Sequence, residues 1–385
     1  MEMKQIYGIV NDITTEILGD SAMLNEDLSN IVDVGTAILN ANSMDNFVRS
    51  LVDHIGKMVF VNRKYSGSVP SVLMDGWEYG AVLEKVSCDK LPDATENESW
   101  ELQDGASYDP NIFYKPSVSA KFYNKRTTFE IPQSITERQA RGSFSNAEQM
   151  NAFTSMLDTW VNNSATVKFS ELIMRTINNM IGETFYDYNS GGTYSGAGNT
   201  RAVNLLYAYN TQFSQSLTAA AAIYNKDFIR FAAYIMGLWK KRLTRISTLF
   251  NIGGTPRFTP DDRLHFVTLA EFDSAAAVYL QSDTYHDEMV RLPASESVPY
   301  WQASGTGYGF SDTSALNIKT VSGHTVTPSG ILGVMFDRDA LGVANIDRRV
   351  TSNYSPKAEF FNMWHKFDAG YFNDTNENFV VFYVA

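Results

Sequence analysis

The chain has 385 residues, of which 44% are hydrophobic and 13% aromatic, so it can bury a large core and wholesale disorder is excluded. Its formal charge is -12, which argues against a general duplex-DNA binder, because such a protein needs a basic field. The single cysteine, Cys88, excludes an intrachain disulfide and a cysteine-based zinc site. Only 19% of the residues are charged, against about 25% in an ordinary soluble protein, so we expect part of the surface to be covered by partners.

The N-terminal region predicts neither a signal peptide nor a membrane anchor. It has no cationic stretch followed by an apolar run. Its segment 44–56 places Phe47, Leu51 and Ile55 on one face of a short helix. The most apolar segment of the chain, 228–239, is too short to cross a bilayer and predicts a buried helix. We therefore expect a protein without membrane contact.

Residues 66–131 predict a β-arm. The segments 69–86 and 118–131 are rich in Val, Tyr, Phe and Thr, as strands are, and the acidic residues between them lie in a stretch without a basic residue. One interpretation is a solvated surface loop, and the other is a long arm whose charged faces meet a neighbouring subunit. The interface candidates are the acidic Asp93, Glu96, Glu98, Glu101 and Asp104 and the basic Lys121, Lys125, Arg126, Arg138 and Arg141.

A long helix follows at 145–181. Ser145 and Glu148 form a capping box, in which each side chain accepts from a free backbone N–H at the start of the helix. Apolar residues recur at helical spacing, no proline interrupts them, and Gly182 predicts the end. Such a helix would be roughly 50 Å long, which favours a structural spine.

The rest of the chain contains both helical and strand patterns, and the fold class that we expect is α+β. A Gly/Ser/Tyr loop at 186–200 precedes a mostly helical region, and a second Gly/Ser/Thr-rich stretch precedes the last strands. The predicted elements are helices within 204–250, a strand at 263–269, a helix at 274–280, and strands at 331–336 and 378–384.

No catalytic constellation stands out. The five histidines lack metal-ligand spacing, and the glycine-rich stretches lack the residues of a nucleotide-binding loop. Asp337 and Asp339 flank Arg338 after a predicted strand, where a local ion pair or turn is favoured over a metal site. We therefore expect no enzyme activity and no cofactor.

Two blocks of the chain resemble a known family. The first comprises VGTAIL at 34–39 and FVRSLVDHIG at 47–56. The second comprises VMFDRDAL at 334–341, NYSPKAEFFNMWH at 353–365 and NENFVVF at 376–382. With the long helix between them, they resemble the major capsid protein of small short-tailed bacteriophages.

The resemblance implies the Hong Kong 97-type capsid fold and a division of the chain. The expected parts are an N-terminal arm at 1–65, an extended β-loop at 66–131, a peripheral domain with the spine helix at 132–185, an axial domain at 186–330 and a return to the peripheral domain at 331–385. It also implies a major head protein that assembles in the host bacterial cytoplasm, as pentamers and hexamers, into an icosahedral or prolate shell. The implied partners are a scaffolding protein, a portal protein and enclosed double-stranded DNA.

Two other functions remain open. A cellular compartment shell of the same fold would enclose protein cargo instead of DNA. A cytosolic hydrolase would use Asp337 and Asp339 as acid and base. Sizing the purified protein separates a shell from a hydrolase.

Overall fold

The structure is a computed structural model that describes residues 69–74, 83–88, 90–92, 94, 96, 104–107, 109, 111–136, 147–190, 193–281, 292–293, 295–301, 314–320 and 322–385. Within these ranges, nothing is described of the side chains of 70, 147–158, 281 and 318. The predicted N-terminal helix at 44–56 and the capping serine Ser145 lie outside the described residues. Across the described part of the chain, no helix is long and apolar enough to span a membrane.

The described chain combines helices with two sheets whose central strands pair antiparallel, which confirms the α+β class. The helical elements are η2 (Pro70–Val72), α5 (Ala147–Tyr188), α6 (Leu205–Phe213), α7 (Ala219–Ala222), α8 (Lys226–Leu243) and α9 (Ala270–Gln281). The strands are β1 (Leu73–Met74), β2 (Leu83–Cys88), β3 (Val118–Tyr123), β4 (Arg126–Thr136), β5 (Ala202–Asn204), β6 (Leu264–Leu269), β7 (Glu296–Val298), β8 (Ile318–Lys319), β9 (Thr325–Val326), β10 (Ile331–Asp337), β11 (Leu341–Ser355), β12 (Phe360–Asn373) and β13 (Phe379–Tyr383).

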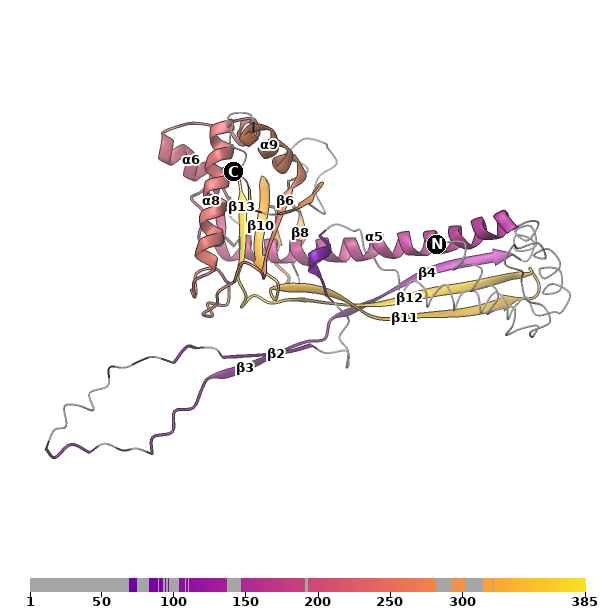
Figure 1. The fold of residues 1–385 in the computed structure, drawn as a ribbon, viewed down its shortest axis with the longest axis horizontal. Helices are drawn as coiled ribbons and strands as arrows, with labels where there is room; N and C mark the ends of the chain where they lie inside the picture. Colours follow the sequence, from indigo (N-terminus) through magenta and orange to yellow (C-terminus); the bar gives the residue numbers. More distant parts are fainter. Residues whose placement is uncertain are drawn as a thin grey trace.

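The long helix α5 runs along the body as a spine (Figure 1). It has 42 residues, which corresponds to about 63 Å. The predicted stop at Gly182 is wrong, because the helix continues to Tyr188. An interior glycine costs a helix about 1 kcal/mol, and tertiary packing offsets this cost. The ring of Phe185, fully buried, lies 4.9 Å from the rings of both Tyr194 and Tyr383, so burial of the last turns holds them helical.

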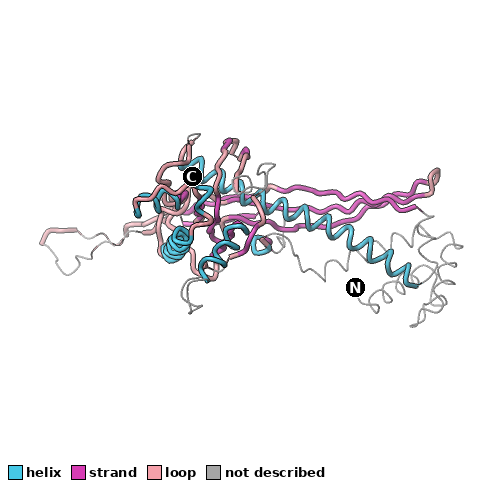
Figure 2. The backbone as a smooth tube through the Cα atoms, turned by 90° about the horizontal axis from the view of Figure 1, so that it is seen from above, coloured by secondary structure: helices cyan, strands magenta, loops and turns pink. Residues whose placement is uncertain are grey.

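A four-stranded sheet lies along α5, in the order β1-β11-β12-β4. The long strands β11 and β12 form an antiparallel hairpin, and β4 pairs antiparallel with the other edge of β12. Figure 2 shows this ribbon extending beside the helix. From Phe360 to Phe367, alternate residues of β12 are buried, as expected of a strand with one covered face. Phe129 of β4 meets Phe169 of α5 edge to face at 6.3 Å.

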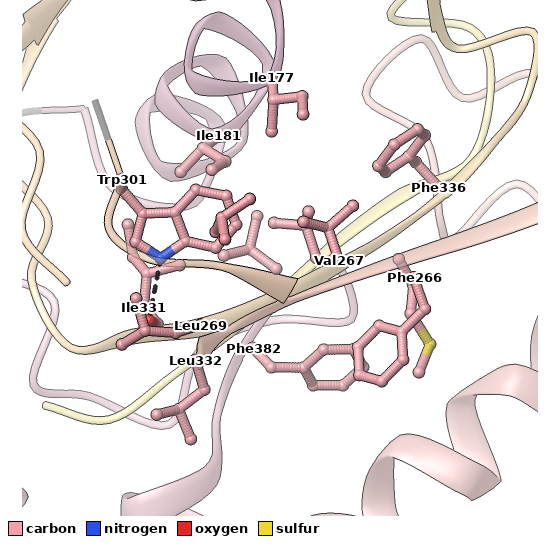
Figure 3. Packing of buried hydrophobic residues seen from close by; sticks show 14 of the residues in the cluster. Ile177, Ile181, Phe266, Val267, Leu269, Trp301, Ile331, Leu332, Phe336 and Phe382 are labelled. Atoms are coloured by element: carbon pink, nitrogen blue, oxygen red, sulfur yellow. Dashed lines mark hydrogen bonds between the residues drawn. The ribbon is translucent and has the colours of Figure 1, made fainter. Parts of the chain in front are cut away.

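A second sheet holds the main core, in the order β5-β13-β10-β6-β7. Every residue of β10 and β13 is buried, which indicates that both faces of these strands are covered. Figure 3 shows Ile177 and Ile181 of α5 on one side of the sheet, with Leu332 and Phe382 on the other. The Trp301 indole N–H donates to the Ile331 carbonyl at 3.1 Å, so this large ring is buried without an unpaired donor.

Three helices surround the second sheet. Helix α8 contacts both α6 and α9, while α6 contacts β13 and α9 contacts β6 (Figure 1). The predicted buried helix at 228–239 is confirmed, since α8 buries Phe228, Ile229, Phe231 and Met236. Asn225 caps its first turn by accepting from the backbone N–H groups of residues 227 and 228.

Strand pairing does not follow the boundary expected at residue 331. Strands β10 and β13 share a sheet with β5 and β6, which come from the expected axial part. Only β11 and β12 return to the sheet along α5. The chain therefore alternates between the two sheets within 331–385.

Candidate subunit interface

Strands β2 and β3 form a two-stranded antiparallel ribbon that projects away from both sheets (Figures 1 and 2). An isolated two-stranded ribbon is marginal in water, so its attachment to the body decides whether it holds a direction. Side chains alternate across it: Lys85, Lys121 and Tyr123 are half-buried toward the body, while Val86 and Phe122 are exposed on the opposite face.

The half-buried face is attached to the body by ion pairs. The Lys85 ammonium lies 2.7 Å from Asp374 Oδ2 and 3.2 Å from Glu377 Oε1, and it also donates to the carbonyl of Asp339 at 3.0 Å. The Lys121 ammonium lies 3.0 Å from the second oxygen of Asp374. Both carboxylates belong to the short connection between β12 and β13, so one turn of the body holds both strands of the arm.

Further contacts surround this set of ion pairs, which we call the anchor. Arg257 lies 3.3 Å from Glu377, and the Asn376 backbone N–H donates to Asp374 at 3.0 Å. The Tyr123 ring packs against the ring of Phe372 at 5.3 Å, which adds apolar contact beside the ion pairs. The anchor therefore combines two lysines, one arginine and two carboxylates with an aromatic contact.

Burial and charge set the pKa values in the anchor. Burial raises the pKa of Asp374, but Lys85, the Asn376 N–H and Lys121 together outweigh it and hold that pKa below its usual value. For Glu377 burial prevails over Lys85 and Arg257, so its pKa is raised. Burial, followed by the neighbouring Asp374 carboxylate, also raises the pKa of Tyr123. Of the two carboxylates in the anchor, Asp374 is therefore the one more firmly held in its charged form.

The opposite face of the ribbon is exposed and mostly apolar, with one charged residue, Glu84, opposite Phe122. Register places Val86 opposite Ala120 and Cys88 opposite Val118, and Phe122 follows on the same face. The exposed fractions of Val86 and Phe122 are both 64%. Farther out, Phe113 and Tyr114 are 84% and 82% exposed. Several exposed apolar side chains on one face are typical of a surface to which another molecule binds.

The structure places only some of the predicted interface residues. Glu96 and Asp104 are exposed on the arm, and Lys125 and Arg126 are exposed at the start of β4. Lys121 differs from these, because it has an acidic partner, Asp374, in its own chain. The remaining candidates lie outside the described residues: Asp93, Glu98, Glu101, Arg138 and Arg141.

Sequence reasoning missed the anchor. Lys85 and Asp374 are 289 positions apart, and no motif joins them. One available signal was the turn-forming stretch NDTNEN at 373–378, which carries two carboxylates directly before a fully apolar strand. Acidic side chains at such a position are held beside the core and need cationic partners.

The acidic pair Asp337 and Asp339 forms the turn and ion pair that the sequence favoured. The Asp339 backbone N–H donates to Asp337 Oδ1 at 2.9 Å, and the Asp339 carboxylate pairs with Arg263. Among the described residues, no group of three or more His, Cys, Asp or Glu side chains is placed to hold a metal ion.

The fold and the arm define a structural class of protein, a subunit with a two-sheet body and an anchored arm that offers apolar surface to a partner. A sequence model of the Phi29-like phage major capsid protein family matches residues 10–383, and the chain belongs to that family. It is therefore a head-shell protein of a phage, with a structural role in the virion capsid.

Individual relatives are more distant. The chain is 27% identical to the major capsid protein of Bacillus phage GA-1 over 177 residues, which cover 43% of this chain and 36% of that protein. The match therefore spans about a third of the length of that curated relative. Among solved structures, a chain of bacteriophage P68 has a TM-score of 0.49 at 11% identity, covering 83% of this chain and 85% of that one. A capsid chain of Staphylococcus phage Andhra has a TM-score of 0.47 at 11% identity, covering 83% and 84%.

Proposed function

We propose that copies of this chain assemble into a closed icosahedral or prolate shell, as pentamers and hexamers, around double-stranded DNA. The observation that carries this proposal is the arm: its base is fixed by ion pairs, while its outer face is apolar and exposed. Contact between two different surfaces of one chain is heterologous, and heterologous contacts with a suitable rotation close into rings. The arm supplies one of those two surfaces.

The net charge of -12 suits a container for DNA. A negative wall does not trap a polyanion that must enter and leave, because it offers few counterion-releasing contacts. The enclosed genome is therefore held by the closed wall and not by sequence-specific binding.

The proposal includes further partners and an arrangement of parts. A scaffolding protein and a portal protein take part in assembly, which takes place in the host bacterial cytoplasm. The parts are the N-terminal arm at 1–65, the extended β-loop at 66–131, the peripheral domain at 132–185 and the axial domain at 186–330. Strand pairing favours counting β10 and β13 with the axial part and leaving only β11 and β12 as the return of the chain.

Lys125 and Arg126 are proposed to meet the acidic residues of a neighbour's arm. Both are exposed at the foot of the arm, and exposed pairs of this kind fix register more than they add affinity. Reversing both to glutamate is expected to impair shell assembly and leave the subunit soluble. The matched control exchanges the two cations, Lys125→Arg with Arg126→Lys, and is expected to assemble. Normal particles from the charge-reversed variant in electron micrographs would contradict this role.

The content of the particles separates this proposal from a compartment shell. Nuclease-protected DNA inside shells made in infected cells supports the phage head, and protein cargo without DNA supports a compartment. A purified chain that stays a monomer or dimer contradicts both.

A further inference from the structure

The C-terminal end of α8 and the loop after it concentrate positive charge in a chain of net charge -12. Residues 228–260 contain six basic residues and no acidic one. Lys241, Arg242 and Arg245 are exposed there. Within the part of the chain that the structure describes, neither Lys241 nor Arg245 has a carboxylate at ion-pair distance, whereas Lys240 pairs with Asp261 at 3.5 Å.

Apolar side chains are exposed on the same segment. Ile246, Leu249 and Phe258 are 54%, 55% and 51% exposed. Backbone hydrogen bonds between Ser247 and Arg257 in both directions close this loop into a defined shape. We name the exposed set Lys241, Arg242, Arg245, Ile246, Leu249 and Phe258 the cationic face.

The loop is hydrogen-bonded to the turn that carries the arm's anchor. The Gly253 backbone N–H donates to the Thr375 carbonyl at 2.8 Å, in the turn that carries Asp374. A side chain at Gly253 has no room, since a Cβ there would lie 1.9 Å from the Asn376 amide oxygen. The backbone of the loop is therefore preorganised, which lowers the entropic cost of binding a partner.

The outer part of the arm has the complementary composition. Between Leu91 and Tyr114 the chain has no basic residue, and the described acidic residues Glu96, Asp104 and Asp109 are all exposed. Exposed apolar residues accompany them at Ile112, Phe113 and Tyr114. Figure 1 shows the outer arm extending beyond the body on the side where α8 lies, so most of the arm lies away from the cationic face of its own chain. Only at the base of the arm does Leu91 line a pocket with Pro256 and Arg257 of the same chain.

We propose that the cationic face of one copy receives the outer arm of a second copy. The inference rests on the proposed function. It gives the neighbour's arm a second receiving surface besides Lys125 and Arg126. Charge complementarity selects the partner, because the cations meet an acidic segment, and the exposed apolar residues on both sides supply contact area. Exposed apolar side chains among the cations favour a protein partner over DNA, whose contacts are predominantly with phosphates.

A charge exchange tests the electrostatic part. Lys241→Glu with Arg245→Glu is expected to lower the yield of closed shells at least tenfold, as is Glu96→Lys with Asp104→Lys. Combining the four substitutions is expected to restore most of the yield. The control Lys319→Glu with Lys357→Glu makes the same charge change at other exposed lysines and is expected to assemble. Normal shells from the variant with Lys241→Glu and Arg245→Glu, or no recovery in the combined variant, would overturn the inference. Normal shells with altered DNA content would overturn it in favour of nucleic-acid contact.

Cross-linking tests the contact directly. All chains in this test carry Cys88→Ser. A chain with Phe113→Cys is mixed with a chain with Leu249→Cys, and the mixture is assembled and oxidised. A covalent dimer is expected for this mixture and not for Phe113→Cys mixed with Val278→Cys, whose position on α9 is 63% exposed. Equal dimer in both mixtures, or none in the first, would refute the contact. If the unmodified chain forms no shells, this result counts against the proposed function. The cross-link still decides the inference in that case, because it needs only two associated chains.

Discussion

Lys85 and Lys121 lie directly opposite each other across the arm, and both bind the carboxylate of Asp374. Like charges at opposed positions destabilise a strand pair unless an opposite charge is shared between them. Asp374 reaches one lysine with each of its oxygens, at 2.7 and 3.0 Å. One buried carboxylate therefore binds both strands of the arm at the point where their lysines face each other.

Asp374→Asn is expected to loosen the arm without unfolding the body. Both lysines lose their shared charge, although Lys85 keeps Glu377, and hydrogen bonds to charged groups contribute about 1.5–3 kcal/mol. Amide hydrogen exchange in β2 and β3 is expected to accelerate by about tenfold or more, with the strands of the five-stranded sheet unchanged. Asp261→Asn, which removes an exposed partner of Lys240, serves as the control. Unchanged exchange in Asp374→Asn would show that the anchor does not hold the arm.

Phe185→Ala is expected to lower the free energy of unfolding by about 3–5 kcal/mol. The ring is fully buried between Tyr194 and Tyr383, so its loss leaves a cavity at the end of α5. Val167→Ala, on an exposed position of the same helix, is expected to change it by less than about 0.5 kcal/mol. Denaturant titration followed by circular dichroism compares the two. Equal stabilities would mean that burial does not hold the last turns of the helix.

The buried residue His365 is expected to make the folded chain less stable in acid. Burial, followed by the charge of Arg348, lowers the pKa of His365 to about 4, against 6.5 when exposed. The unfolded chain therefore binds more protons between these values, and stability falls as the pH drops through this window. Between pH 7 and pH 5 the loss from this residue is about 2 kcal/mol.

Unfolding midpoints at pH 7 and pH 5 check this dependence. His365→Gln is expected to reduce the difference between the two, whereas His324→Gln, at a part-exposed histidine beside Glu183, is expected to retain it. An unaltered pH dependence in His365→Gln would show that His365 is not its source.

Gly330→Ala is expected to be far more damaging than Gly254→Ala. Both residues have positive φ, at 70° and 63°, and pay a similar backbone cost on substitution. A Cβ at Gly330 would lie 1.9 Å from the Val384 carbonyl oxygen, whereas Gly254 faces open space. We expect an additional loss of about 2–3 kcal/mol at Gly330, visible as a lower unfolding midpoint. Equal losses at the two positions would show that the close approach to Val384 is relieved without cost.

Local patterns were enough to predict most elements. The spine helix, the buried helix at 228–239 and the strands β6, β10 and β13 follow from periodicity and composition within short windows. The end of the spine helix was not predictable in this way, because Gly182 is a local stop signal and the packing of Phe185 against Tyr383 is not local. Where tertiary burial opposes a local signal, the sequence alone does not show which prevails.

The site was predictable only in part. The acidic stretch and the arm strands are visible in the sequence, and so is the alternation of Lys121 with its neighbours. The sequence suggested charged faces toward a neighbour, whereas the structure turns Lys121 toward Asp374 and leaves Phe122 exposed. Which face of an alternating strand is turned toward the body depends on what the fold places beside that strand. Here it is a turn 253 positions away from Lys121.

The central claim is assembly through the arm, and the mass and structure of the purified protein test it most directly. Sedimentation and electron cryo-microscopy of the unmodified chain are expected to show closed megadalton shells in which each arm lies on a neighbouring copy. A monomer or dimer at all concentrations, or shells whose arms contact only their own subunit, would contradict the claim.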